Sequence, residues 1–151
     1  MDGNMFLGNY KHSVDKKNRV KLPSNLRRKV VDDSLILTKG ENNQITVFTH
    51  ESWENYISPI KEKALHNKNY KIYLRAIFAS AEEVSIDSQG RIRIPPELSS
   101  FSKIDDEVII VGIDQIIELW NPDNYEKEMV EVDEKLAEYH DYIAKEEGFL
   151  K

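Results

Sequence analysis

The chain repeats itself at an interval of 72 residues, and this repeat limits the folds that it can adopt. The stretch "VDKKNRVKLPSNL" (Val14–Leu26) matches "IDSQGRIRIPPEL" (Ile86–Leu98) in its acid, its arginine, its alternating apolar positions and its proline. The register returns later, where Phe48 aligns with Trp120. An internal repeat indicates architecture before any local pattern does. We therefore predict two copies of one structural unit, each about half of the chain.

Both copies have the same predicted order of elements. A short strand (10–14 or 83–86) leads through a polar turn into a second strand (19–22 or 91–94), where apolar and basic residues alternate. A proline then ends the second strand, because proline has no N–H for a ladder bond. A β-hairpin follows (35–48 or 108–120), and after it comes a helix. Thr49 is the predicted cap of one such helix, and Asn121 with Pro122 begins the other.

Two longer helical stretches are predicted. Residues 50–81 are expected to be helical with an interruption at Pro59, because proline removes a helix hydrogen bond. From Asn121 onward one helix is expected, because apolar residues recur at alternating spacings of four and three. These residues are Tyr125, Met129, Val132, Leu136, Tyr139 and Ile143. We expect the stripe to pack on the chain's own body or on a neighbouring subunit rather than on a different protein.

A half unit of this size does not bury a core alone. We therefore predict one α+β fold, in which both copies form a small β-barrel around a pseudo-two-fold axis with helices at its periphery. The predicted parts are a first unit (5–57), a connecting helical segment (58–81), a second unit (82–128) and an amphipathic helical tail (129–151). Met5 is a candidate natural start, with residues 1–4 as an extension.

Composition argues against several classes of function. The chain has no cysteine, which excludes disulfides, thiolate metal sites and cysteine catalysis. No apolar run is long enough for a membrane span, and the first residues lack a signal-peptide pattern, so we expect a cytoplasmic protein. The four histidines lack metal-ligand spacing, and neither a phosphate loop nor a nucleophile elbow is present. We therefore predict no enzymatic activity, no metal, no cofactor and no small-molecule substrate.

Charge is distributed unevenly along the chain. The net charge is −6, yet residues 5–31 contain eight basic residues and one acid. Residues 123–151 contain ten acids and four bases. Separate basic and acidic regions indicate one face for a polyanion and a different face for something else.

The doubled motif Asp-x-x-x-Arg, at Asp15–Arg19 and Asp87–Arg91, is the main candidate site. A structural interpretation makes each aspartate a turn brace that accepts backbone N–H groups, with Asn18 or Gly90 supplying a positive φ. A functional interpretation makes each arginine a DNA contact, because a guanidinium binds a phosphate or a guanine edge through two parallel hydrogen bonds. The candidate DNA-binding residues are Arg19, Arg91, Lys16, Lys17, Lys21 and Arg93.

Several alternatives stand beside this interpretation. A basic strand face is often only a solvated surface, and residues 27–29 either extend it or solvate a short helix. A carboxylate dyad of the aspartic-protease kind is disfavoured, because an arginine near each aspartate holds it ionised. Neither "DKKN" nor "DSQG" is the Asp-Ser/Thr-Gly turn of those enzymes. Trp53 and Trp120 are expected to serve as core residues.

The sequence resembles the MraZ family of bacterial transcriptional regulators. The matching segments are "MFLGNYKHSVDKKNRVKLP", "RAIFASAEEVSIDSQGRIRIPPEL" and "IIELWNP". The resemblance implies an AbrB-like swapped-hairpin barrel, assembly into rings, and binding to direct repeats upstream of the cell-wall and cell-division gene cluster. It places the DNA-contacting motif at Asp15–Arg19 and Asp87–Arg91. The family commonly has glycine where this chain has Asn18, and asparagine tolerates that turn conformation.

The predicted function is that of a sequence-specific, nucleoid-associated transcriptional regulator. We expect it to bind double-stranded DNA at promoter direct repeats as a homo-oligomeric ring, because many weak identical loops gain affinity by acting together. The second copy has Ser88 and Gln89 where the first has Lys16 and Lys17, so unequal contributions are expected. The alternative is an oligomeric scaffold that binds protein partners through its tail and rim.

Overall fold

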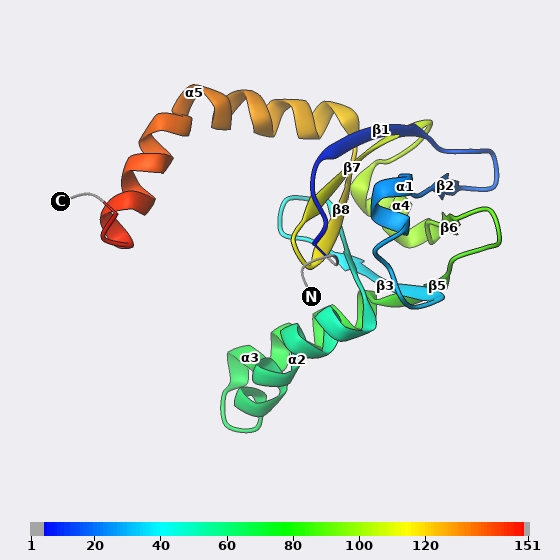
Figure 1. The fold of residues 1–151 in the computed structure, drawn as a ribbon. Helices are drawn as coiled ribbons and strands as arrows, with labels where there is room; N and C mark the ends of the chain where they lie inside the picture. The colour runs from blue at the N-terminus through cyan, green and yellow to red at the C-terminus, as the bar shows by residue number, and fades with distance from the viewer. Residues whose placement is uncertain (1–4, 150–151) are drawn as a thin grey trace. The chain divides into compact units, whose positions relative to one another are not determined.

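The structure, a computed structural model, describes residues 5–149 and has an α+β fold (Figure 1). It divides into two units, one up to Asn121 and one from Pro122 onward. The strands are β1 (Asn9–Ser13), β2 (Arg19–Lys21), β3 (Ser34–Lys39), β4 (Ile45–Phe48), β5 (Glu82–Ser85), β6 (Arg91–Arg93), β7 (Glu107–Ile113) and β8 (Ile116–Trp120). The helices are α1 (Ser24–Arg27), α2 (His50–Ala64), α3 (Lys68–Ser80), α4 (Pro96–Ser102) and α5 (Pro122–Glu146).

The predicted order of elements is confirmed. Each copy contributes two short strands, a short helix, a β-hairpin and a helix, and α3 is inserted between the copies. The short helices α1 and α4 begin directly after Pro23 and Pro95, which hold their N-cap positions. Thr49 caps α2 as expected, since its side chain accepts the N–H of Ser52 while the Ser52 hydroxyl accepts the N–H of Thr49.

Strand pairing joins the two copies at four places, in addition to the hairpin within each copy. One antiparallel sheet has the order β1-β7-β8-β4-β3-β5, and a separate two-stranded ribbon pairs β2 with β6. Thus β1 of the first copy pairs with β7 of the second, and β5 of the second pairs with β3 of the first. Val20 lies opposite Ile92, its equivalent at the 72-residue interval, and Thr46 likewise lies opposite Glu118. These two pairs therefore mark the local two-fold relation between the copies.

The core is formed by the inward residues of the ribbon and the sheet. Val20 and Leu22 of the first copy are at most 2% exposed, as are Ile92 and Ile94 of the second. The predicted alternation along the second strand of each copy is therefore confirmed. Aliphatic residues from the short helices and from β3, β4, β7 and β8 join the same cluster. This shared core fixes the ribbon relative to the larger sheet.

The N-terminal segment is held against the β7–β8 hairpin. The N–H of Phe6 donates to the Asp114 carbonyl at 2.7 Å, and the Asp114 N–H donates back at 2.8 Å. Gly112 is required here, because a Cβ on it would lie 2.5 Å from the backbone nitrogen of Leu7. Phe6 is itself buried in the core cluster.

The predicted interruption at Pro59 is wrong. Helix α2 continues through Pro59 to Ala64, and the chain bends at residues 65–67, where the Asn67 side chain caps α3. Pro59 is exposed, and the packing of other α2 residues offsets the hydrogen bond that it removes. Trp53 of α2 meets the rings of Phe48 and Phe78 edge-on, and Tyr56 shares a hydroxyl hydrogen bond with Tyr73.

Helix α5 forms the second unit and confirms the predicted single C-terminal helix. It begins at Pro122, as expected, and contains no buried residue. In the later part of its apolar stripe, Leu136, Tyr139 and Ile143 are each about half exposed. The packing of this stripe on the chain's own body or on a neighbouring subunit stays a prediction. Within residues 5–149, no helix has both the length and the apolar content that a membrane crossing needs.

Candidate nucleic-acid interface

The first loop is organised around the carboxylate of Asp15. Its Oδ1 accepts the backbone N–H of Lys17 at 2.9 Å and that of Arg19 at 2.8 Å. Its Oδ2 accepts the Nε–H of the Arg19 side chain at 2.8 Å. One backbone bond between the same two residues closes the turn: the Asp15 N–H donates to the Arg19 carbonyl at 2.9 Å. One side chain thus fixes the turn and the direction of its arginine.

The second loop has the same geometry around Asp87. Oδ1 accepts the N–H groups of Gln89 and Arg91, both at 2.9 Å. Oδ2 accepts the Nε–H of Arg91 at 2.8 Å. The aspartates are therefore turn braces, as the structural interpretation predicted. Each is paired with its own arginine, an arrangement that holds it ionised and leaves no proton to share in a dyad.

The pKa of both aspartates is lowered from the usual value. The largest cause is the hydrogen bond from the backbone N–H of the arginine four residues on, and the guanidinium adds a second favourable bond. Both bonds stabilise the ionised carboxylate. The two loops thus carry negative braces at neutral pH, each with a cation fixed beside it.

Positive φ angles close both turns where the sequence predicted them. Asn18 has φ 63° and Gly90 has φ 77°. The backbone carbonyl of each residue accepts an N–H from the other copy, from Ile94 and Leu22 respectively, both at 2.9 Å. No sequence pattern predicts these bonds between copies. They place the two loops at the same end of the first unit (Figure 1).

The ribbon brings together four of the predicted DNA-binding residues. Arg19 lies directly opposite Arg93, and Lys21 lies opposite Arg91. Lys21 and Arg93 are exposed, while the side chains of Arg19 and Arg91 are 29% and 26% exposed. The Nε of each partly exposed arginine binds its aspartate. Within residues 5–149, the Nη groups of these arginines have no hydrogen-bond partner.

The remaining candidates lie in the first loop alone. Lys16 and Lys17 are exposed at the turn, at the positions that Ser88 and Gln89 occupy in the second loop. The first loop therefore adds two cations to the charge of the ribbon. The two loops therefore differ in charge although their backbones form the same hydrogen bonds.

Residues 27–29 take part in contacts within the chain. Arg27 donates to the Val30 carbonyl at 3.3 Å, and Arg28 donates to the Asn25 side chain at 3.2 Å. Lys29 donates to the Met5 carbonyl at 2.7 Å. These bonds favour the structural alternative for the three residues. Trp120 is buried, as expected of a core residue, whereas Trp53 is partly exposed within its aromatic cluster.

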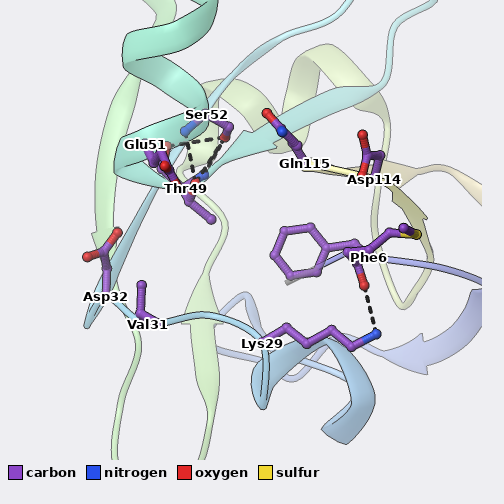
Figure 2. A pocket seen from close by; sticks show the side chains of 10 residues that line it. Phe6, Lys29, Val31, Asp32, Thr49, Glu51, Ser52, Asp114 and Gln115 are labelled. Atoms are coloured by element: carbon purple, nitrogen blue, oxygen red, sulfur yellow. Dashed lines mark hydrogen bonds between the residues drawn. The ribbon is translucent and has the colours of Figure 1, made fainter. Parts of the chain in front are cut away.

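A cavity of about 250 Å³ lies away from the ribbon, next to the start of α2 (Figure 2). Its polar groups already have structural partners: Thr49 and Ser52 cap the helix together, and Lys29 holds the N-terminal segment. Asp32, on the same wall, accepts the N–H of His50 at 3.3 Å. The arrangement is that of a capped helix end and not of a nucleophile with its base.

Comparison with known proteins gives a consistent result. A family model described as "MraZ protein, putative antitoxin-like" matches residues 5–75 and 77–140. The transcriptional regulator MraZ of Alkaliphilus metalliredigens is 38% identical over 121 residues, which cover 80% of this chain and 84% of that protein. The protein of the same name from Clostridium tetani is 37% identical over 82% of this chain and 86% of its own length. That of Thermoanaerobacter pseudethanolicus is 35% identical over 92% of this chain and 99% of its own.

Proposed function

The chain belongs to the MraZ family, and from that premise we propose that it is a DNA-binding transcriptional regulator whose contact surface is the β2–β6 ribbon with its two loops. The relatives named above are each called a transcriptional regulator, and regulators of transcription are not a class of enzyme. The proposed contact residues are Arg19, Lys21, Arg91 and Arg93 on the ribbon and Lys16 and Lys17 in the first loop.

The opposition of like charges across the ribbon is the observation that carries this proposal. Cross-strand neighbours lie about 4.5–5.5 Å apart, and like charges at that distance destabilise a sheet. Here both basic pairs are cation opposite cation, Arg19 with Arg93 and Lys21 with Arg91. Within residues 5–149 neither Lys21 nor Arg93 has an acidic partner. Phosphates of a nucleic acid supply the negative partner that Lys21 and Arg93 lack.

The shape of the ribbon suits duplex DNA. A two-stranded antiparallel ribbon fits the major groove, where an arginine binds guanine O6 and N7 through two parallel hydrogen bonds. The Asp brace holds each loop arginine by Nε, which leaves the two Nη groups for such a fork. The loop lysines, as flexible point charges, suit phosphates instead. This division assigns positioning to the lysines and base recognition to the arginines.

The finer features of the proposal concern fold and assembly. We propose that residues 5–57 and 82–128 are two AbrB-like units, joined by residues 58–81, whose hairpins exchange strands to make a barrel. The pairing of β1 with β7 and of β5 with β3 supports this exchange.

The proposed target is a set of promoter direct repeats of the cell-wall and cell-division cluster. The chain binds them as a ring, on the nucleoid in the cytoplasm. A ring presents copies of the ribbon in head-to-tail order, which matches direct repeats.

The proposal is tested by measuring DNA affinity at fixed salt. Fluorescence anisotropy with a labelled duplex that contains the direct repeats upstream of the gene is compared with a scrambled duplex. Arg19→Ala is expected to weaken binding by roughly 5- to 150-fold, the cost of about 1–3 kcal/mol for one base-contacting arginine. Lys71→Ala, which removes an exposed cation on α3, is the matched control and is expected to bind like the parent.

Light scattering accompanies the binding measurement, and the same particle size is expected for all three proteins. Equal binding by Arg19→Ala and the parent would refute the assignment of the ribbon. The scaffold alternative has one observation in its favour, the half-exposed apolar stripe of α5. It predicts negligible DNA affinity at physiological salt together with a co-purifying protein partner.

A further inference from the structure

The two loops differ in one hydrogen bond that crosses between the copies. The symmetric bonds, Ile94 N–H to the Asn18 carbonyl and Leu22 N–H to the Gly90 carbonyl, have the same length of 2.9 Å. Asn18 adds a bond that glycine has no side chain to make: its Nδ2 donates to the Ile94 carbonyl at 2.7 Å. Both backbone groups of Ile94 are therefore bound to one residue of the first loop.

This second bond lies next to a pair of opposed cations. Asn18 precedes Arg19 in the chain, Ile94 follows Arg93, and the two arginines face each other across the ribbon. The doubled connection thus fixes the two backbones at the place where like charges push the strands apart. On the other side of the local two-fold, next to the pair of Lys21 and Arg91, the equivalent residue Gly90 forms the backbone bond with Leu22 but has no side chain to add a second one.

We propose that Asn18 is a positioning residue for DNA binding, which holds the first loop on the second copy so that Arg19 is pre-organised for its contact. The inference rests on the proposed function of the ribbon. A loop that is already ordered loses less conformational freedom on binding, and this raises affinity without a new contact. Asparagine suits the position because it tolerates the positive φ and also carries an amide donor.

The main test is Asn18→Gly, which permits the same φ and changes no charge but removes the amide. DNA affinity is expected to fall roughly two- to tenfold, as one net hydrogen bond is worth about 0.5–1.5 kcal/mol. The slope of log affinity against log salt is expected to stay unchanged, because the phosphate contacts are the same in number. In the free protein, the amide of Ile94 is expected to exchange with solvent faster, as measured by hydrogen exchange and NMR.

The second loop offers the reciprocal variant, Gly90→Asn. There is room for the side chain, because the nearest atom to a Cβ built on Gly90 is Arg27 Cγ at 3.9 Å. The new amide is expected to reach the Leu22 carbonyl, slow the exchange of the Leu22 amide and raise DNA affinity, because the second loop is then held on the first copy by the same two bonds. This variant separates the effect of the bond from the effect of altering the first loop.

Three results would overturn the inference. Unchanged affinity of Asn18→Gly, in a parent protein that binds DNA, removes the positioning role. A change in base preference with unchanged exchange at Ile94 makes Asn18 a direct contact instead. A loss of affinity explained by a lower melting temperature makes the bond merely structural. Failure of the proposed function is distinguishable, because then the parent itself binds no repeat DNA.

Discussion

The two Asp-x-x-x-Arg loops share their geometry and differ in their chemistry. In both, one aspartate accepts two backbone N–H groups and its arginine's Nε–H, with corresponding distances equal to within 0.1 Å. The first loop carries Lys16 and Lys17, where the second carries Ser88 and Gln89. Shape is thus set by the brace and the ribbon, and charge is set by residues at the tip. Loop shape and loop charge are therefore encoded by different residues and can be altered separately.

The largest expected effect comes from the position where the two loops share a core. Ile92→Ala is expected to lower the free energy of unfolding by roughly 2–5 kcal/mol, because it removes a fully buried aliphatic side chain. Val20→Ala, its partner across the local two-fold, is expected to cost less, since valine is smaller by a methylene. Urea unfolding monitored by tryptophan fluorescence measures both values. A cost confined to one loop in hydrogen exchange would contradict a shared core.

An exchange of the loop tips tests whether charge alone separates the loops. Lys16→Ser with Lys17→Gln gives the first loop the residues of the second, and the slope of log affinity against log salt is expected to fall by about 1.8 if both lysines contact phosphates. Ser88→Lys with Gln89→Lys is the reciprocal variant and is expected to steepen the slope. Anisotropy titrations at several salt concentrations measure both. A slope that changes in neither variant would show that the loop tips do not reach the DNA backbone.

Removal of a brace gives a smaller but more discriminating effect. Asp15→Ala deletes a negative charge near the DNA, so electrostatics alone predicts tighter binding. The geometry predicts the opposite, about three- to tenfold weaker binding, because Arg19 and the turn lose their hydrogen bonds. Asp87→Ala is the matched variant in the second loop and is expected to act in the same direction. Tighter binding by Asp15→Ala would mean that the arginine works without its brace.

Features of the fold and the site are predictable from sequence when they depend on residues close together in the chain. The brace, the positive φ at residues 18 and 90, and the inward and outward positions of the ribbon depend on neighbours within a few residues, and these predictions are confirmed. The repeat also predicted a two-fold relation between copies. The pairing of β1 with β7 and the bond from Asn18 to Ile94 depend on tertiary contacts, which no local pattern encodes.

The error at Pro59 has the same origin. A proline inside a helix is unfavourable by local rules, yet α2 continues through it because its other residues pack against α3 and β4. Tertiary packing therefore outweighs a local preference. The bend falls at Asn67, whose capping side chain was the better local signal. The roles of the lysines and arginines in DNA binding stay predictions, because no sequence pattern distinguishes a solvated basic strand from a bound one.

The smallest expected effect is the pH dependence of the two braces. The folded-state pKa of Asp15 and of Asp87 lies below the usual 3.8, so each carboxylate contributes its full stabilisation above about pH 4. That contribution is lost as the pH falls through the lower folded-state pKa, where the carboxylate takes up its proton. NMR titration of the side-chain carboxyl carbons measures both values, with Asp15→Asn and Asp87→Asn as assignment controls. Because the causes are the same bonds in both loops, the two pKa values are expected to agree. A clearly lower value for Asp15 would mean that Lys16 and Lys17 act on the brace, and shape and charge would then not be separate in the first loop.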